Sequence, residues 1–167
     1  LCAEYADKGF AVIPHIAARM VEGEDHVDRI ARRVRDAGIR KVFCIGGDAD
    51  PRGPFADSAA FLRSFLDRRP EIDAVGIGSY PDGHAAITEQ VLDDAQVEKQ
   101  EIIRQAGLQG YMATQMCFDA QTIVSWLERR RAAGVSLPCH LGVPGAVDRT
   151  RLLAISIRLG IGHSARY

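Results

Sequence analysis

The sequence predicts an α/β fold in which helices cover a parallel sheet, and three observations support this prediction. Short apolar runs rich in Val and Ile, typical of buried parallel strands, alternate with longer segments whose apolar residues recur at helical spacing. A helix-stopping residue ends each helical segment, at Gly9, Gly38, Pro70, Gly107 and Gly134. These stops lie 27 to 37 residues apart, the length of a βα unit. Five such units in succession predict parallel strands with helices outside them.

The N-terminal part is predicted to contain the end of a helix at 1–8 and a strand at 10–17. Gly9 separates the two and suits the left-handed conformation that often follows a helix. The segment 10–17 is rich in Val, Ile and Ala, as buried parallel strands are. Pro14 interrupts it, and a proline is tolerated in a strand only near its end.

Apolar stripes at helical spacing predict two helices in the middle of the chain. The first begins near Asp25 and ends at Ala37, and its stripe consists of Val27, Ile30, Ala31 and Val34. The second spans 57–69, and its stripe consists of Phe61, Leu62, Phe65 and Leu66. Each is followed by a short apolar run, which predicts strands at 41–45 and 74–79.

The C-terminal part continues the alternation. Its predicted elements are a helix at 89–106, a strand at 111–115, a helix that opens at 116–119 and ends at Arg131, a strand at 137–143 and a helix at 149–159. We expect a single domain over 1–167. A (β/α)8 TIM barrel needs about 200 residues or more, so a barrel with five units would be incomplete. A doubly wound sheet is the alternative, although no GxGxxG motif opens a helix.

The composition is that of a globular protein and narrows the function classes. The chain is 47 % hydrophobic and 26 % charged with a net charge of −1, which argues against nucleic acid or a membrane surface as partner. No apolar run reaches the length of a membrane span. The four cysteines form no CxxC pair, so we expect reduced thiols, no zinc site built from them and a cytoplasmic location. A homo-oligomer is compatible with this composition.

Polar residues follow the predicted strands where α/β proteins carry their chemistry. Asp48 comes directly after Gly46 and Gly47, which leave room for a flat ligand on the backbone. The other strand ends hold His15, Tyr80 with His84, Thr114 with Gln115, and the turn at 142–145. Taken singly, each is more simply explained as a hydrogen-bonded loop residue. Five such strand ends together favour a site for a planar ligand. Aromatic rings can stack on such a ligand, and a glutamine amide can form hydrogen bonds with it.

Five short motifs occur one after another along the chain. They are Ile13-Pro14-His15, Gly47-Asp48, Tyr80-Pro81-Asp82-Gly83-His84, Ala106-Gly107 with Thr114-Gln115-Met116-Cys117-Phe118-Asp119, and Pro138 to Gly142. In this order they resemble the methylenetetrahydrofolate reductase family, whose pattern runs PH, RGD, YPxxHP, AGA…TQxFFD and PG. The similarity covers almost the whole chain, and YPxxH followed by AG…TQ…FD is its most specific part. It implies that the chain matches strands three to seven of that family's barrel.

The resemblance implies an oxidoreductase of one-carbon metabolism and methionine biosynthesis that reduces 5,10-methylenetetrahydrofolate with NAD(P)H through FAD. It implies cofactor contacts at His15, Gly47, Asp48, Tyr80 and His84. It implies contacts to the tetrahydrofolate substrate at Asp48, Thr114, Gln115 and Phe118, with Asp48 and Gln115 catalytic. Opening of the substrate's five-membered ring gives a cationic iminium, which a nearby carboxylate stabilises. The family's general acid, a glutamate, lies on a first strand that has no counterpart among the five predicted here.

Departures from the family pattern leave alternatives open. The arginine of RGD is Gly46 here, and a lysine before the AG motif falls at Ile103, with Lys99 and Arg104 as the nearest substitutes. A flavin-independent member, or a paralogue acting on another tetrahydrofolate derivative, is therefore one alternative. A non-catalytic folate- or flavin-binding module is a second. A metal-dependent barrel hydrolase is a third, with its ligands at His15, Asp48, His84 and His140.

Overall fold

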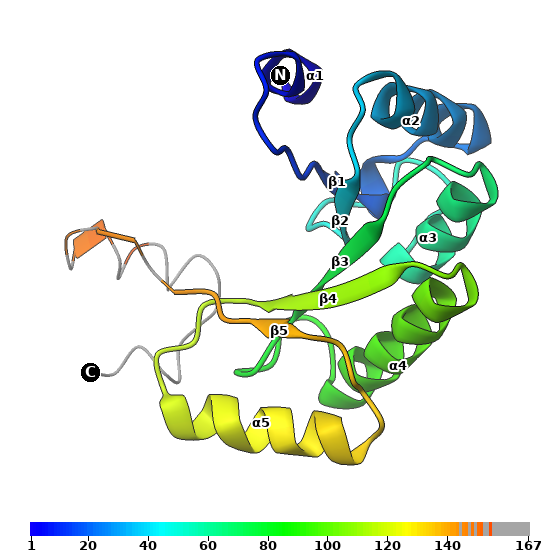
Figure 1. The fold of residues 1–167 in the computed structure, drawn as a ribbon. Helices are drawn as coiled ribbons and strands as arrows, with labels where there is room; N and C mark the ends of the chain where they lie inside the picture. Colours follow the sequence, from blue (N-terminus) through cyan, green and yellow to red (C-terminus); the bar gives the residue numbers. More distant parts are fainter. Residues whose placement is uncertain (144, 147, 149, 152–153, 155–167) are drawn as a thin grey trace. The chain divides into compact units, whose positions relative to one another are not determined.

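A computed structural model describes residues 1–143, 145–146, 148, 150–151 and 154 (Figure 1). Its elements are α1 (Cys2–Asp7), β1 (His15–Ala17), the 3₁₀ helix η1 (Ala18–Met20), α2 (Glu24–Asp36), β2 (Lys41–Ile45), α3 (Ser58–Asp67), β3 (Ala74–Ser79), α4 (Glu89–Gln105), β4 (Gln109–Thr114), α5 (Ala120–Ala132) and β5 (Cys139–His140). The helix predicted at 149–159 falls largely outside the described residues. In the part of the chain that is described, no helix has the length and apolar character needed to cross a membrane.

The strands form one sheet in the order β1-β2-β3-β4-β5. The pairs β1–β2, β2–β3 and β4–β5 run parallel, with register partners such as His15 and Phe43 at one edge and Met112 and Cys139 at the other. The backbone N–H of Gln115 donates to the carbonyl of Ser79 at 2.7 Å and so joins the ends of β3 and β4. The predicted α/β fold with a parallel sheet is thus confirmed, whereas closure into a barrel stays a prediction.

The contacts divide the chain into two compact units. The first comprises Leu1–Ile77 and Glu98–Tyr111, and the second comprises Gly78–Val97 and Met112–Tyr167. β3, α4 and β4 each run from one unit into the other. The strand ends that carry the candidate residues are therefore distributed over both units, and the expectation of a single domain stays a prediction.

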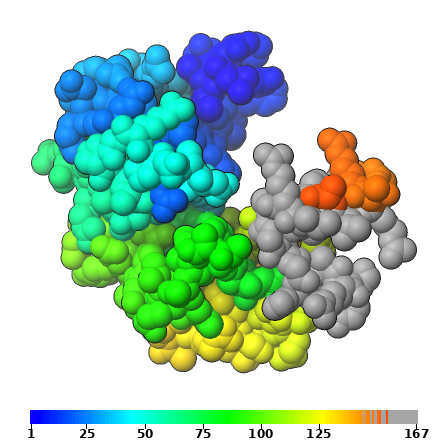
Figure 2. Space-filling view, turned by 180° about the vertical axis from the view of Figure 1, so that it is seen from behind, coloured from blue at the N-terminus to red at the C-terminus, as the bar shows by residue number. Residues whose placement is uncertain are grey.

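In the first unit, α2 and α3 pack side by side, and their atoms form a continuous surface in Figure 2. Arg68, which follows α3, donates to Glu24 at 2.5 Å and to Asp28 at 2.9 Å, both on α2. Asp57 begins α3 by accepting hydrogen bonds from the backbone of Ala59 and Ala60. The predicted stripes lie in the core: Val27, Ala31, Val34, Phe61, Leu62 and Phe65 are buried, and Ile30 and Leu66 are half-buried.

One face of the sheet in the first unit carries a row of rings. His15 stacks on Phe43, its register partner, with ring centroids 4.6 Å apart, and Phe43 lies 6.1 Å from Tyr111. Gly76 pairs with Phe43, and a Cβ at Gly76 would overlap the rings of both Phe43 and Tyr111. Only glycine leaves the rings the space between β2 and β4.

Two predicted strands are shorter in the structure than the sequence indicated. The first begins at His15 rather than at residue 10, and the last spans only Cys139 and His140 rather than 137–143. Pro14 directly precedes the first of these strands, and Pro138 directly precedes the last. Neither proline has an N–H to donate, although the carbonyl of each accepts a ladder hydrogen bond. Beyond the last strand, the N–H of Gly142 donates to the Thr114 hydroxyl instead of a strand carbonyl. The missing proline N–H groups limit both strands at their starts, and the Gly142 hydrogen bond ends the last ladder early.

Substitution of Gly76 by Ala is expected to lower the free energy of unfolding by about 1–3 kcal/mol, because the added methyl group overlaps two packed rings. Urea denaturation monitored by circular dichroism measures this change. Gly46→Ala is the matched control, since a Cβ there meets no atom within 4 Å. Equal stability of Gly76→Ala and Gly46→Ala would contradict the packing described for this face.

Candidate functional site

The end of β2 presents Asp48 on a glycine turn. Gly47 has a φ of +91°, in the left-handed region that favours glycine, and a Cβ there would lie 3.1 Å from the Cβ of Ala17. Both features require a residue without a side chain. Asp48 itself is exposed, and no hydrogen bond or ion pair from its carboxylate occurs within the described part of the chain. The carboxylate is therefore available to a ligand.

Arg19 organises the loop that carries Asp48, and sequence reasoning did not find this residue. Its guanidinium donates to the carbonyl of Ala56 at 2.9 Å and to that of Gly47 at 3.4 Å. Its backbone N–H donates to the Gly46 carbonyl at 3.0 Å. A single side chain thus joins both ends of the loop, although these partners lie up to 37 residues away in sequence. Contacts of this range produce no periodicity in a sequence.

His15 lies in the same unit as Gly47 and Asp48. It is exposed on the ring-bearing face of the sheet, opposite the face on which Ile16 is buried. The face of its ring is supported by Phe43, so its edge is left for a ligand. The structure therefore brings His15, Gly47 and Asp48 into one unit. Gly47 and Asp48 follow β2 as predicted, but the prediction that His15 stands at the carboxyl end of a strand is wrong, because β1 begins at His15 instead of ending there.

The turn at 80–87 follows β3 and belongs to the second unit. The N–H of Gly83 donates to the Tyr80 carbonyl at 3.0 Å, and the N–H of Ala86 donates to Nδ1 of His84 at 3.2 Å. Because Nδ1 accepts a hydrogen bond, Nε2 carries the proton of the neutral imidazole. The rings of Tyr80 and His84 meet edge to face, with centroids 5.2 Å apart. The turn thus holds the two rings as one rigid pair.

Thr114 is the last residue of β4 and Gln115 follows it in the same unit, but the two differ in exposure. Thr114 is buried, and its hydroxyl accepts the N–H of Gly142 at 2.9 Å. A Cβ at Gly142 would overlap the Thr114 carbonyl, so this close approach also requires glycine. Gln115 is half-buried, and its backbone is fixed to Ser79. The Thr114 hydroxyl thus holds the backbone of Gly142, whereas the contacts that were predicted from Thr114 and Gln115 to a substrate stay predictions.

The segment from Gln115 to the start of α5 is held by two side chains. Asp119 caps α5, where its carboxylate accepts the Thr122 hydroxyl at 2.6 Å and the Gln121 N–H at 2.9 Å. These hydrogen bonds, the Thr122 one foremost, lower the pKa of the Asp119 carboxyl. The thiol of Cys117 donates to Asp82 at 3.4 Å. Phe118 lies between them and is half-buried.

Two cations on α4 lie near the position where the family pattern has a lysine and this chain has Ile103. Lys99 is buried, and Arg104 forms an ion pair. Ile103 is buried in the core. Lys99 is buried within electrostatic range of Cys44, and burial lowers the pKa of its ammonium while burial raises the pKa of the Cys44 thiol to about 12. Arg104 is exposed and donates to both carboxylate oxygens of Glu101. Lys99 is thus buried away from solvent, and Arg104 is paired with Glu101 on the surface.

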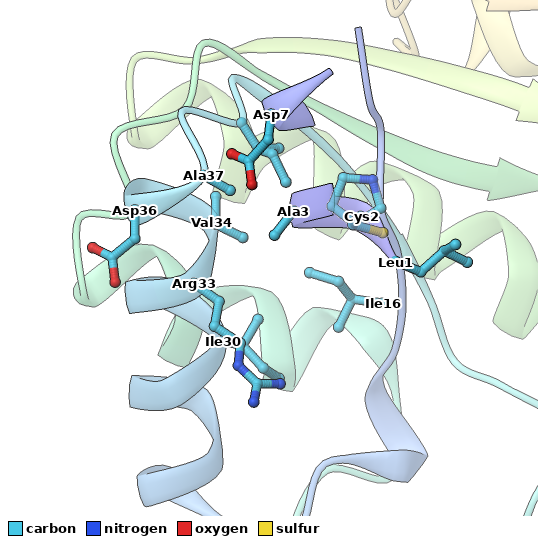
Figure 3. A pocket seen from close by; sticks show the side chains of 12 residues that line it. Leu1, Cys2, Ala3, Asp7, Ile16, Ile30, Arg33, Val34, Asp36 and Ala37 are labelled. Carbon is cyan, nitrogen blue, oxygen red and sulfur yellow. The ribbon is translucent and has the colours of Figure 1, made fainter. Parts of the chain in front are cut away.

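A pocket of about 650 Å³ lies in the first unit between α1, β1 and α2 (Figure 3). Ala3, Ile16 and Val34 point into it, and Asp7 and Asp36 lie at its rim. It opens on the helix-covered face of β1, where Ile16 points, rather than at a strand end. None of the predicted site residues lines it.

The metal-site alternative gains no support from the described residues. No group of three or more His, Cys, Asp or Glu side chains within them is arranged to hold a metal ion. His140 pairs with Ala113 of β4 and is exposed, on the face opposite the buried Met112. It therefore does not point toward the helices.

Comparisons with known proteins agree with the resemblance drawn from the motifs. Residues 3–147 match the family model described as methylenetetrahydrofolate reductase. The chain is 21 % identical over 126 residues to "Methylenetetrahydrofolate reductase 1" of Schizosaccharomyces pombe. This alignment covers 70 % of the chain and only 20 % of that relative, so the chain spans about a fifth of the relative's length.

The low pKa of Asp119 predicts an acid-sensitive cap on α5. A carboxyl whose pKa falls below its ordinary value of 3.8 on folding stabilises the protein above that pH, and this stabilisation is lost as the pH falls through the folded-state pKa. Acidification from about pH 6 to about pH 3 should therefore destabilise the wild type more than Asp119→Asn, which still accepts hydrogen bonds but does not titrate. Urea denaturation across this range measures both slopes. Identical slopes would contradict the assignment.

Proposed function

Because the chain belongs to the methylenetetrahydrofolate reductase family, we propose that the protein containing it reduces 5,10-methylenetetrahydrofolate to 5-methyltetrahydrofolate with NAD(P)H. The observation that carries this proposal is the unpaired, exposed carboxylate of Asp48 on the glycine turn after β2. Parallel strands bring their carboxyl ends to one edge of a sheet, which is where enzymes of this class of fold bind substrates. We propose that the pterin binds at this edge.

The reaction requires stabilisation of a positive charge. The bond between the methylene carbon and N10 breaks, N10 takes a proton, and an iminium cation remains on N5. A hydride from the reduced nicotinamide then adds to the methylene carbon, which gives the methyl group and NAD(P)+. We propose that Asp48 stabilises the iminium, since a carboxylate placed where positive charge develops lowers the barrier. Arg19 restrains the backbone of the loop that carries this carboxylate through its hydrogen bond to Gly47.

The second unit offers the groups that would bind and orient the pterin. The amide of Gln115 both donates and accepts hydrogen bonds, which matches the alternating donors and acceptors of a pterin edge. Thr114 fixes the end of β4 beside it through Gly142. Tyr80 and His84 provide an aromatic edge and an N–H at Nε2 that suit a planar ring. Phe118, half-buried after Gln115, would add an apolar contact to the substrate.

At the two positions where the family pattern carries a cation, the residues present do not fit the diphosphate of FAD. His15, Gly47, Tyr80 and His84 are suited to contact a flat ring, but a diphosphate also requires cationic or backbone donors. Gly46 supplies no charge, Lys99 is buried, and Arg104 is paired with Glu101. The absence of a free cation at these positions favours direct hydride transfer from NAD(P)H. A protein of this kind would act in one-carbon metabolism in the cytoplasm.

Two measurements on the full-length protein test this proposal. NADH or NADPH oxidation should accelerate on addition of 5,10-methylenetetrahydrofolate, and 5-methyltetrahydrofolate should be detected as product. The absorption spectrum of the purified protein separates the two hydride routes, because a bound flavin would show its bands and bleach on reduction. Folate binding without turnover would favour the non-catalytic alternative, and turnover of a different tetrahydrofolate derivative would favour the paralogue.

Asp48→Asn should lower kcat at least about tenfold and leave the melting temperature unchanged, because the side chain is exposed and stabilises only the transition state. Steady-state kinetics and thermal unfolding measure the two quantities. Asp50→Asn is the matched control, since Asp50 is exposed in the same loop. Equal losses of activity and stability in Asp48→Asn would assign Asp48 to the scaffold instead.

A further inference from the structure

A thiol–carboxylate hydrogen bond joins two loops of the second unit. The turn at 80–87 follows β3, and the segment 115–119 follows β4. Sγ of Cys117 donates to Oδ1 of Asp82 at 3.4 Å, across 35 residues of sequence. Both loops carry residues that the proposed function assigns to the pterin.

This hydrogen bond restrains both loops, because each of its two residues lies close in sequence to residues of the proposed site. Asp82 lies midway between Tyr80 and His84, in a turn that its own hydrogen bonds and the edge-to-face ring pair make rigid. Cys117 lies two residues after Gln115 and two residues before Asp119, the cap of α5. A restraint at Asp82 therefore fixes both rings, and a restraint at Cys117 fixes Gln115 from its C-terminal side.

The local environment favours the hydrogen bond. Cys117 is buried, with an exposed fraction of 6 %, so water does not compete freely for its thiol. A thiol is a weak donor, but an ionised carboxylate acceptor strengthens the bond. The Asp119 carbonyl lies 3.6 Å from the same sulfur and is a second, longer acceptor.

We propose that the hydrogen bond from Cys117 to Asp82 positions the turn at 80–87 against the segment 115–119, so that Tyr80 and His84 keep a fixed place relative to Gln115. Cys117 is a positioning residue, since it acts through Asp82. The inference rests on the proposed function where it names the pterin as the ligand that these loops hold. The link itself is independent of that function.

The link is tested first on the protein without ligand, by hydrogen–deuterium exchange of the full-length chain. Cys117→Val keeps a similar volume but has no donor, so amides of 80–87 should exchange at least about threefold faster than in the wild type. Cys117→Ser keeps a donor and should restore part of the protection. Cys139→Val is the matched control, because Cys139 is half-buried in β5 of the same unit. Unchanged exchange in Cys117→Val would overturn the inference.

Kinetics test the consequence for ligand binding. In Cys117→Val the KM for 5,10-methylenetetrahydrofolate should rise about three- to tenfold while kcat changes less than about twofold, because one positioning hydrogen bond is lost. Asp82→Ala should show the same split, and the double variant should add no further loss. Asp82 is half-exposed, so this variant tests the link even where a change at buried Cys117 impairs folding. Additive losses in the double variant would contradict the coupling.

The two experiments separate the link from the proposed function. Faster exchange of 80–87 in a protein whose wild type neither binds nor reduces the folate would support the link and refute the function. Folate reduction by the wild type, with unchanged exchange of 80–87 and an unchanged KM in Cys117→Val, would support the function and refute the link.

Discussion

The structure depends on the register of its parallel ladders. The N–H of Phe43 donates to the Pro14 carbonyl, that of Gln109 to Asp73, and that of Met112 to Pro138, each at 2.9 to 3.0 Å. Side chains alternate along a strand, so this register decides which residues face the helices and which face away from them. A slip of one residue in β2 would move Phe43 from the row of rings to the helix-covered side. The same register determines which residues stand at the carboxyl ends of the strands.

The sequence predicted the middle of the fold better than its ends. The strands at 41–45 and 74–79 match the structure residue for residue, because each is an apolar run bounded by polar or turn-forming residues. The segments 10–17 and 137–143 are equally apolar, but their ladders are limited by proline and by the hydrogen bond of Gly142. A strand's length depends on its neighbour's hydrogen bonds, and composition does not encode them. The register of the strands in the sheet could likewise not be predicted from the sequence.

Asp48, Tyr80 and Gln115 follow β2, β3 and β4 as predicted, because the end of an apolar run marks the end of a strand. His15 was placed wrongly, because the first strand begins at this residue. The resemblance to the family pattern came from these residues and agrees with the match over 3–147. The side chains that hold them were not predictable. Arg19 and Cys117 act through partners 28 to 37 residues away, and no periodic pattern marks such contacts. The burial of Lys99, which removes it as a phosphate ligand, also became evident only in three dimensions.

We propose that polar residues following neighbouring strands bind a pterin, and an experimental structure of the full-length protein with 5-methyltetrahydrofolate would test this binding directly. We expect hydrogen bonds between the Gln115 amide and the pterin ring, with the Asp48 carboxylate close to N5. A pterin bound elsewhere, for example in the pocket between α1 and α2, with Asp48 and Gln115 both facing solvent, would contradict the account.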